Sequence, residues 1–169
     1  AHLLSHTQKK IRAFIVGDGE TRADLEAMAT QAGISFTTEK DNQHPHPLVF
    51  TSWRSDVDVI NAGLDIICLT SFNEGTPVSL IEAQAANKPI VSTRVGGIAD
   101  ILAEGETGLL ADINDTELYC DHLLRLVEDD ALRHKLGSNS SSHVMEKFSY
   151  QRLVRDMSKL YWELLERKV

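Results

Sequence analysis

An apolar run at residues 64–69 is followed almost at once by helix-start signals, and this succession constrains the fold more than any other feature. The run Leu-Asp-Ile-Ile-Cys-Leu is typical of a strand buried on both faces, as in a parallel sheet. Thr76 suits a helix N-cap and Pro77 suits the first helical position, so we expect a helix from Pro77 to about Asn87. A buried strand that leads into a helix predicts an α/β architecture.

Strand and helix patterns alternate along the rest of the chain. Strands are predicted at 11–16, 48–51, 89–93 and 108–111, and helices at 21–32, 56–62 and 97–103. From Asp115 to the end, the apolar spacing predicts helix almost throughout. The serine-rich stretch 138–142 interrupts this region and predicts a turn or a polar helix face. The alternation is typical of a doubly wound parallel sheet, here with a helical carboxyl-terminal segment.

The connection between residues 34 and 49 is long and polar, and we expect it to be an exposed loop. It holds His44 and His46, each followed by a proline. Two histidines without a nearby cysteine or a helical partner four residues away make a poor metal site. We therefore assign no metal.

Composition fits one domain with a substantial core, because 42% of the 169 residues are hydrophobic. The 25 acidic residues outnumber the 17 basic ones, which argues against a nucleic-acid partner, since binding phosphates needs clustered cations. Cys68 and Cys120 lack metal-ligand spacing and are expected to be small buried side chains. No apolar stretch reaches the ~18 residues of a membrane span, and the first residues lack a signal-peptide pattern, so we expect a cytoplasmic location.

Two carboxylates flank the predicted helix start, and they are the best candidates for chemistry. Glu74 lies in the loop, and Glu82 lies about two turns further along the helix. A helix that starts at the carboxyl end of a parallel strand offers free N–H groups to an anion, and Gly75 lets a ligand approach the backbone closely. One carboxylate suits sugar hydroxyls and the other suits a ribose diol, with the phosphates between them.

Residues 73–83 read Asn-Glu-Gly-Thr-Pro-Val-Ser-Leu-Ile-Glu-Ala, followed by Lys-Pro-Ile-Val-Ser-Thr at 88–93 and Val-Gly-Gly at 95–97. This string resembles the nucleotide-sugar-binding, carboxyl-terminal domain of retaining glycosyltransferases with the GT-B fold, of the glycosyltransferase group 1 or family 4 type. The resemblance covers nearly the whole chain, with further matches at 15–19, 52–57, 106–110 and 148–150. It implies the Rossmann-like half of a GT-B fold.

The resemblance implies transfer of a hexosyl group from a nucleotide diphosphate sugar with retention at the anomeric carbon. In the family, the residue that matches Glu74 binds donor-sugar hydroxyls and is our catalytic candidate, whereas the residue that matches Glu82 binds the ribose. Front-face attack and double displacement on Glu74 both stay open. The other donor-binding candidates are Gly17 and Gly19 at the cleft wall, Ser52, Trp53 and Arg54 around the nucleobase, and Gly75, Thr76, Pro77 and Ser79 at the sugar or phosphate.

Several candidates also have a plainer explanation. Core packing explains Trp53 about as well as a base contact does. Glu82 alone would be an ordinary solvated helix residue, and Glu74 a first-turn carboxylate favoured by the helix dipole. The stretch 17–19, Gly-Asp-Gly, lacks the third glycine of the dinucleotide fingerprint, which argues against NAD. The surrounding string favours the functional explanations.

Family members carry a further strand with a Gly-Arg motif and a downstream lysine before the position that matches Leu3, and these cations clamp the diphosphate. Here the sequence opens inside the following helix. We therefore expect residues 1–169 to be a single donor-binding domain that lacks this strand and the amino-terminal acceptor domain, and to be inactive alone. The nucleotide-sugar donor and that missing domain are the expected partners, without a cofactor, and peripheral membrane association through that domain stays open. The alternatives are a nucleotide-sugar epimerase of the same fold and a catalytically silent nucleotide-sugar-binding partner.

Overall fold

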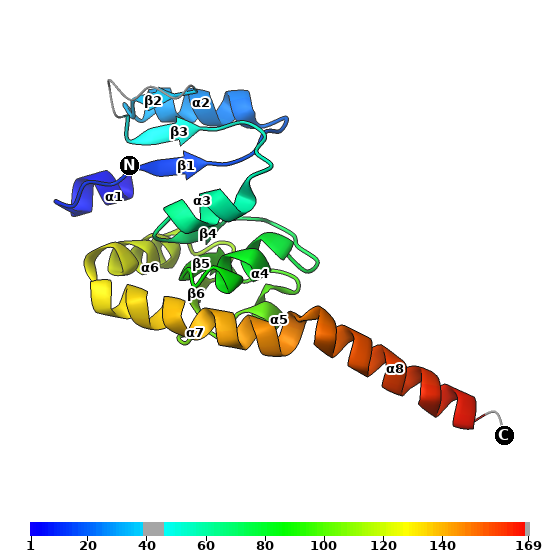
Figure 1. The fold of residues 1–169 in the computed structure, drawn as a ribbon. Helices are drawn as coiled ribbons and strands as arrows, with labels where there is room; N and C mark the ends of the chain where they lie inside the picture. The colour runs from blue at the N-terminus through cyan, green and yellow to red at the C-terminus, as the bar shows by residue number, and fades with distance from the viewer. Residues whose placement is uncertain (39–45, 168–169) are drawn as a thin grey trace. The chain divides into compact units, whose positions relative to one another are not determined.

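A computed structural model describes residues 1–38 and 46–167 of the chain, drawn in Figure 1. The chain divides into two compact units, Ala1–Val57 and Asp58–Val169. Each unit is built on its own three-stranded parallel sheet. The predicted α/β class with parallel strands is therefore confirmed.

The sheet of the first unit has the strand order β1-β3-β2. Its elements are α1 (His2–His6), β1 (Ala13–Ile15), α2 (Arg22–Gln31), β2 (Phe36–Thr37) and β3 (Leu48–Phe50). The short strand β2 corrects our expectation of a loop between residues 34 and 49. The rings of Phe36 and Phe50 meet edge to face with their centroids 5.2 Å apart, a tertiary contact that a local sequence pattern does not reveal.

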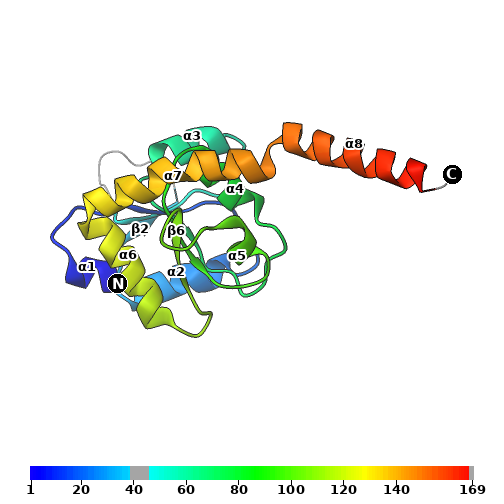
Figure 2. The same cartoon turned by 90° about the horizontal axis from the view of Figure 1, so that it is seen from below.

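The sheet of the second unit has the order β4-β5-β6, with all strands parallel. The elements from this part of the chain are α3 (Val57–Gly63), β4 (Ile67–Leu69), α4 (Val78–Ala85), β5 (Ile90–Thr93), α5 (Ile98–Ile101), β6 (Gly108–Ala111), α6 (Thr116–Glu128), α7 (Asp130–Phe148) and α8 (Tyr150–Glu166). Helix α7 packs along α4 (Figure 1 and Figure 2).

Both faces of this second sheet are covered. Neighbouring residues of a strand point to opposite faces, so Ile90 and Val91 show what packs on each. Ile90 of β5 packs in one buried cluster with Leu80 of α4 and Ile98 of α5. Val91, the next residue, packs in a second cluster with Leu126 of α6, on the other face. The doubly covered sheet fixes the ends of β4 and β5, from which the candidate site is built.

Strand β4 differs from its expected burial on both faces. Ile67 and Leu69 are half-buried and Cys68 is exposed, because β4 lies at an edge of its sheet and is covered incompletely. Cys120 is half-buried. The two cysteines are thus less buried than predicted.

Side-chain caps divide the helical carboxyl-terminal region into α6, α7 and α8. The side chains of Asp115, Asp129 and Ser149 each accept a hydrogen bond from a backbone amide three residues later. The serine-rich stretch 138–142 lies inside the continuous helix α7, so of the two predicted alternatives the turn is wrong and the polar helix face is observed, with Ser138, Asn139 and Ser142 exposed. Ser140 is buried there, and its Oγ donates to the Leu136 carbonyl at 2.8 Å, which satisfies the hydroxyl without breaking the helix.

Helix α8 has an apolar stripe at helical spacing, formed by Leu153, Met157, Leu160 and Leu164. These side chains are exposed. Within the described ranges, no helix is both long and apolar enough to cross a membrane.

Candidate functional site

The second unit brings Glu74 to the carboxyl ends of two neighbouring strands. β4 and β5 pair in parallel, with Leu69 opposite Ser92, so the loops that follow them leave the same edge of the sheet. Glu74 is half-buried in the first of these loops. Ser71 Oγ donates to Glu74 Oε1 at 2.6 Å, and Thr93 Oγ1 donates to the Ser71 carbonyl at 2.8 Å. The Glu74 carboxylate is therefore oriented by Ser71, whose backbone is held in turn by Thr93 of β5.

Two glycines after β5 hold the Glu74 loop from the other side. The Gly97 amide donates to the Gly75 carbonyl at 3.0 Å. Gly96 has φ +51°, and a Cβ at this position would overlap the Glu74 carbonyl oxygen. A Cβ on Gly97 would likewise overlap the Gly75 carbonyl oxygen. From the sequence, Gly96 and Gly97 are recognised only as part of the family string. Their position just after the predicted strand 89–93 is the signal that places them at the site.

Helix α4 begins at Val78, one residue later than predicted, and its N-cap is Pro77 rather than Thr76. Pro77 has extended backbone (φ −70°, ψ 103°), and its carbonyl accepts from the Leu80 amide at 3.1 Å. The cap makes no side-chain hydrogen bond. Gly75 and Thr76 are exposed before it, so the turn presents its backbone to solvent. The helix ends at Ala85, two residues before the predicted end.

Glu82 lies on the outer side of α4. Ser79 and Glu82 are exposed and three residues apart, which places them on the same helix face. Leu80 and Ala83 are fully buried on the opposite side. The second unit thus combines Glu74, an open helix start and Glu82 within one loop and the two turns that follow it.

The other candidates, Gly17, Gly19, Ser52, Trp53 and Arg54, belong to the first unit. There the loops after β1 and β3 meet, because the Gly17 amide donates to the Ser52 carbonyl at 3.1 Å. Gly17 has φ +115°, which favours glycine, whereas Ser52 adopts φ +55° without being glycine. Gly19 is exposed, with open space where a Cβ would lie.

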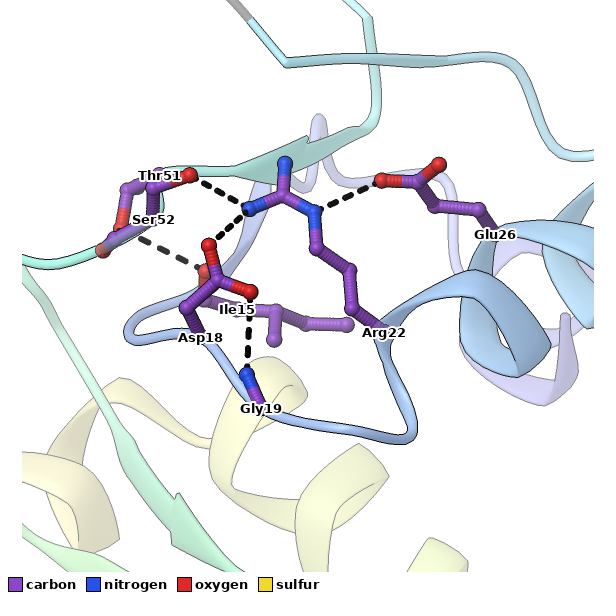
Figure 3. A network of polar contacts seen from close by, with 7 residues as sticks. All are labelled: Ile15, Asp18, Gly19, Arg22, Glu26, Thr51 and Ser52. Atoms are coloured by element: carbon purple, nitrogen blue, oxygen red, sulfur yellow. Dashed lines mark hydrogen bonds and ion pairs between the residues drawn. The ribbon is translucent and has the colours of Figure 1, made fainter.

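A polar network surrounds Ser52, as Figure 3 shows. Asp18 accepts from the Gly19 amide at 2.9 Å, and this bond is the main cause that lowers the pKa of Asp18. Smaller contributions come from Ser52 and Arg22. Asp18 is therefore ionised at neutral pH and loses its charge only as the pH falls through that lowered pKa.

Trp53 is 81% exposed, so the core-packing explanation for this residue is wrong. Arg54, the next residue, turns back to Asp56 in a two-point ion pair, with Nε 2.8 Å from Asp56 Oδ1. The hydrogen bond to Asp56 raises the pKa of Arg54. Because Asp56 balances its charge, Arg54 offers little net positive charge to an anion.

Two further arginines near strand ends are balanced in the same way. Arg22 contacts the carboxylates of Asp18 and Glu26 at 3.0 and 2.8 Å. Arg94, which follows β5, binds both carboxylate oxygens of Glu104 at 2.7 Å. None of these three arginines is set up as a free cation for a phosphate.

No metal centre emerges from the part of the chain that the structure describes. Groups of three or more His, Cys, Asp or Glu side chains able to hold a metal ion do not occur in it. His46 is half-buried, and His44 lies outside the described residues.

Comparison with known proteins identifies relatives across most of the chain. The sequence profile of the family "Glycosyl transferases group 1" matches residues 1–143. D-inositol 3-phosphate glycosyltransferase of Corynebacterium jeikeium is 32% identical over 164 residues, covering 94% of this chain. N-acetyl-alpha-D-glucosaminyl L-malate synthase of Bacillus anthracis is 30% identical over 149 residues, covering 86% of this chain. The chain spans only 37% and 39% of the lengths of these two relatives.

Solved structures share the fold at low sequence identity. A point mutant of S. aureus TarM, in complex with UDP and other ligands, superposes with a TM-score of 0.78 at 20% identity, over 95% of this chain and 31% of that one. Anabaena HepE in complex with UDP and glucose gives 0.74 at 20% identity, over 92% and 42%. The carboxyl-terminal domain of a Francisella tularensis group 1 glycosyl transferase gives 0.65 at 19% identity, over 89% and 94%. The chain therefore belongs to the glycosyl transferases group 1 family and has the α/β fold of the Rossmann-like, carboxyl-terminal part of GT-B enzymes.

Proposed function

We propose that this chain is the donor-binding domain of a retaining glycosyltransferase that transfers a sugar from a nucleotide diphosphate sugar to an acceptor yet to be identified. The observation that carries the proposal is the arrangement around α4. An oriented carboxylate, Glu74, precedes an open helix start, and a second carboxylate, Glu82, is exposed on the same helix. Membership of the glycosyl transferases group 1 family supports this interpretation of the geometry.

Each part of the donor has a group that suits it. Glu74 takes hydroxyls of the donor sugar, and Glu82 takes the ribose diol. The backbone amides of Gly75 and Thr76, with Ser79 in the first turn of α4, suit the phosphates, because a helix start leaves N–H groups without intrahelical partners. Pro77 has no N–H and fixes the backbone of the turn as the N-cap. The nucleobase is assigned to residues 52–54, Ser-Trp-Arg, with Gly17 and Gly19 close to the donor.

Catalysis by such a site rests on orientation and electrostatics. Holding the sugar by Glu74 and the diphosphate by α4 fixes the anomeric carbon relative to its leaving group. The N–H groups of the helix start stabilise the negative charge that develops on the departing diphosphate. Glu74 places a negative charge beside the positive charge that grows on the reacting sugar. Retention fits both front-face attack and double displacement on Glu74.

The charges of the chain indicate that the donor needs cations from elsewhere in the full-length protein. Arg22, Arg54 and Arg94 are each balanced by carboxylates, and the net charge is −8. A dianionic diphosphate is repelled by such a surface. We propose that a preceding strand with a Gly-Arg motif and a lysine supplies the clamp, and that an amino-terminal domain supplies the acceptor site.

The test is a calorimetric binding screen of UDP-, GDP- and ADP-sugars and the bare diphosphates against the full-length protein. HepE and TarM are described in complexes with UDP, which makes the uridine series the first choice. Glu82→Ala should weaken binding of both the nucleotide sugar and the bare nucleotide by about tenfold or more, because both make a charged hydrogen bond through the ribose. Glu146→Ala, at an exposed glutamate of α7, is the matched control and should change neither affinity.

The outcomes separate the proposal from its alternatives. Absence of nucleotide-sugar binding by the full-length protein would overturn it. Conversion of the donor sugar without any acceptor would identify an epimerase. Binding without turnover over a broad panel of acceptors would identify a catalytically silent partner.

A further inference from the structure

Arg22, the first residue of α2, connects the two loops of the first unit. Its Nη1 donates to Asp18 Oδ2 at 3.0 Å and to Ser52 Oγ at 2.5 Å, and its Nε donates to Glu26 Oε1 at 2.8 Å (Figure 3). The guanidinium also lies over the Phe50 ring, 5.6 Å from its centroid. Asp18 belongs to the loop after β1, and Ser52 to the loop after β3, so one side chain ties both.

The backbone at Ser52 explains why such a tie is needed. Ser52 has φ +55°, a left-handed conformation that costs a residue with a Cβ free energy and persists only when its surroundings enforce it. Hydrogen bonds from outside the loop hold the residue: the Gly17 amide donates to the Ser52 carbonyl, and Arg22 donates to the Ser52 hydroxyl, which is also hydrogen-bonded with Asp18. The bond from Arg22 comes from a side chain 30 residues away in sequence.

The conformation of Ser52 decides where the next residues lie. Trp53 follows it and is 81% exposed, and Arg54 turns back to Asp56. Nη1 donates to both Asp18 and Ser52, and Nε donates to Glu26, so the guanidinium serves the two sides through two nitrogens that its plane holds at a fixed spacing. A lysine ends in a single nitrogen, one bond short of Nη1, and cannot serve both sides. The network is therefore specific for arginine.

We propose that Arg22 is a positioning residue that fixes the loop of residues 52–54 for the donor's nucleobase and so sets nucleobase preference. This inference rests on the proposed function, because it assumes that the loop receives the base of a nucleotide sugar. In this proposal Arg22 acts through Ser52, because Nη1 donates to Asp18 and Ser52 and Nε donates to Glu26.

The test compares Arg22→Lys with Glu26→Gln in the full-length protein. Glu26 binds Arg22 on the side away from the loop, so Glu26→Gln perturbs the same network and leaves the contacts with Asp18 and Ser52 in place. Arg22→Lys should weaken binding of the preferred nucleoside diphosphate by about tenfold, the effect of losing one charge-assisted hydrogen bond. It should also bring the affinities for UDP, GDP and ADP closer together. The donor KM should rise by a larger factor than kcat falls. Nucleotide affinity of Glu26→Gln should stay within about twofold of that of the parent protein, because the amide keeps an oxygen that accepts from Arg22 Nε.

A second measurement does not depend on nucleotide binding. Hydrogen exchange followed by mass spectrometry should show faster exchange in a peptide covering 50–57 for Arg22→Lys and for Ser52→Ala, and parent-like exchange for Glu26→Gln. If the parent protein binds no nucleotide, the proposed function fails, and this measurement still decides whether Arg22 holds the loop. Unchanged exchange, an unchanged nucleobase preference, or equal effects of Arg22→Lys and Glu26→Gln would overturn the positioning role.

Discussion

Glu74 owes its orientation to a neighbouring hydroxyl, Ser71, and lies outside the helix that follows it. We expect Glu74→Gln in the full-length enzyme to reduce turnover on the order of a hundredfold, since about 3 kcal/mol of transition-state stabilisation would be lost. Affinity for the free nucleotide should stay close to that of the parent, because the carboxylate serves the sugar. Steady-state kinetics and calorimetry measure the two effects. Near-normal turnover would reduce Glu74 to a helix-start residue, and equal losses for both ligands would assign it to the phosphates.

Gly96 offers a second test at the scale of single residues. Gly96→Ala places a Cβ against the Glu74 carbonyl and forces a positive φ on alanine, so it should displace the Glu74 loop. Gly105 is the matched control, because its φ is +76° but a Cβ there meets only open space. Gly105→Ala should lose roughly 1–2 kcal/mol of stability from backbone strain, and Gly96→Ala should lose more, because the overlap with the Glu74 carbonyl adds to the same strain. Only Gly96→Ala should also lose donor affinity and turnover, measured on the full-length protein, and parent-like kinetics for it would contradict the packing role.

The sequence could predict single residues only where local spacing decided their place. Glu74 in a loop and Glu82 on the following helix were predicted from the strand, the proline and the helix pattern around them. The sequence does not identify Ser71 or Arg22. Ser71 lies three residues before Glu74, but its contact depends on the conformation of a loop, which apolar spacing does not specify. Arg22 reaches Ser52 across 30 residues, a contact that only the pairing of β1 with β3 creates.

Within α4, the buried side chain of Gln84 lowers the stability of the fold, and replacing it by an apolar side chain of the same length should raise that stability. Its side chain is fully buried, and Nε2 donates to the carbonyls of Leu80 and Ile101. Among the residues that the structure describes, no donor lies within hydrogen-bond distance of Gln84 Oε1. Gln84→Met keeps the length of the side chain and removes the buried oxygen, so we expect stability to rise by about 1–3 kcal/mol.

Thermal and urea unfolding of the parent and variant would measure this gain. Gln151→Met, at an exposed glutamine of α8, is the control and should stay within roughly 0.5 kcal/mol of the parent. A loss of stability in Gln84→Met would show that the two bonds made by Nε2 outweigh the buried oxygen.

Helices and strands with strong local signals were predicted well, and the exceptions have tertiary causes. The aspartate and serine caps at 115, 129 and 149 set the starts of α6, α7 and α8. The stretch 138–142 stays helical although its serines favour turns, because packing of α7 along α4 and the back-bond of Ser140 override local preference. β2 depends on its pairing with β3, and so left no pattern of its own.

At the scale of the whole molecule, we expect the 169-residue chain by itself to show no transferase activity. The arginines near its strand ends are already paired, and the chain spans only 39% and 37% of the lengths of two relatives. The purified chain should give no detectable sugar transfer in a coupled nucleotide-release assay, while circular dichroism shows an α/β fold. The full-length protein, assayed in parallel, is the positive control. Measurable turnover by the isolated chain with any donor and acceptor would contradict the expectation.

The family and the α/β class could be predicted from the sequence because the string at 73–97 and the strand-helix alternation are both local. The division into two compact units could not, since it depends on which strands pair. β1 pairs with β3, and β4 with β5, and neither choice is written in the apolar runs themselves.

The contact of Gly96 and Gly97 with the backbone of Glu74 and Gly75 also bears on attempts to change donor choice by engineering. The conformation of the loop that holds Glu74 depends on the turn after β5, because the two backbones are in contact. Transplanting residues 70–77 from a homologue would therefore import side chains without the geometry that presents them. A successful exchange has to replace residues 70–77 and 93–97 together. In libraries that vary only one of the two segments, we expect most variants to hold Glu74 in the wrong position.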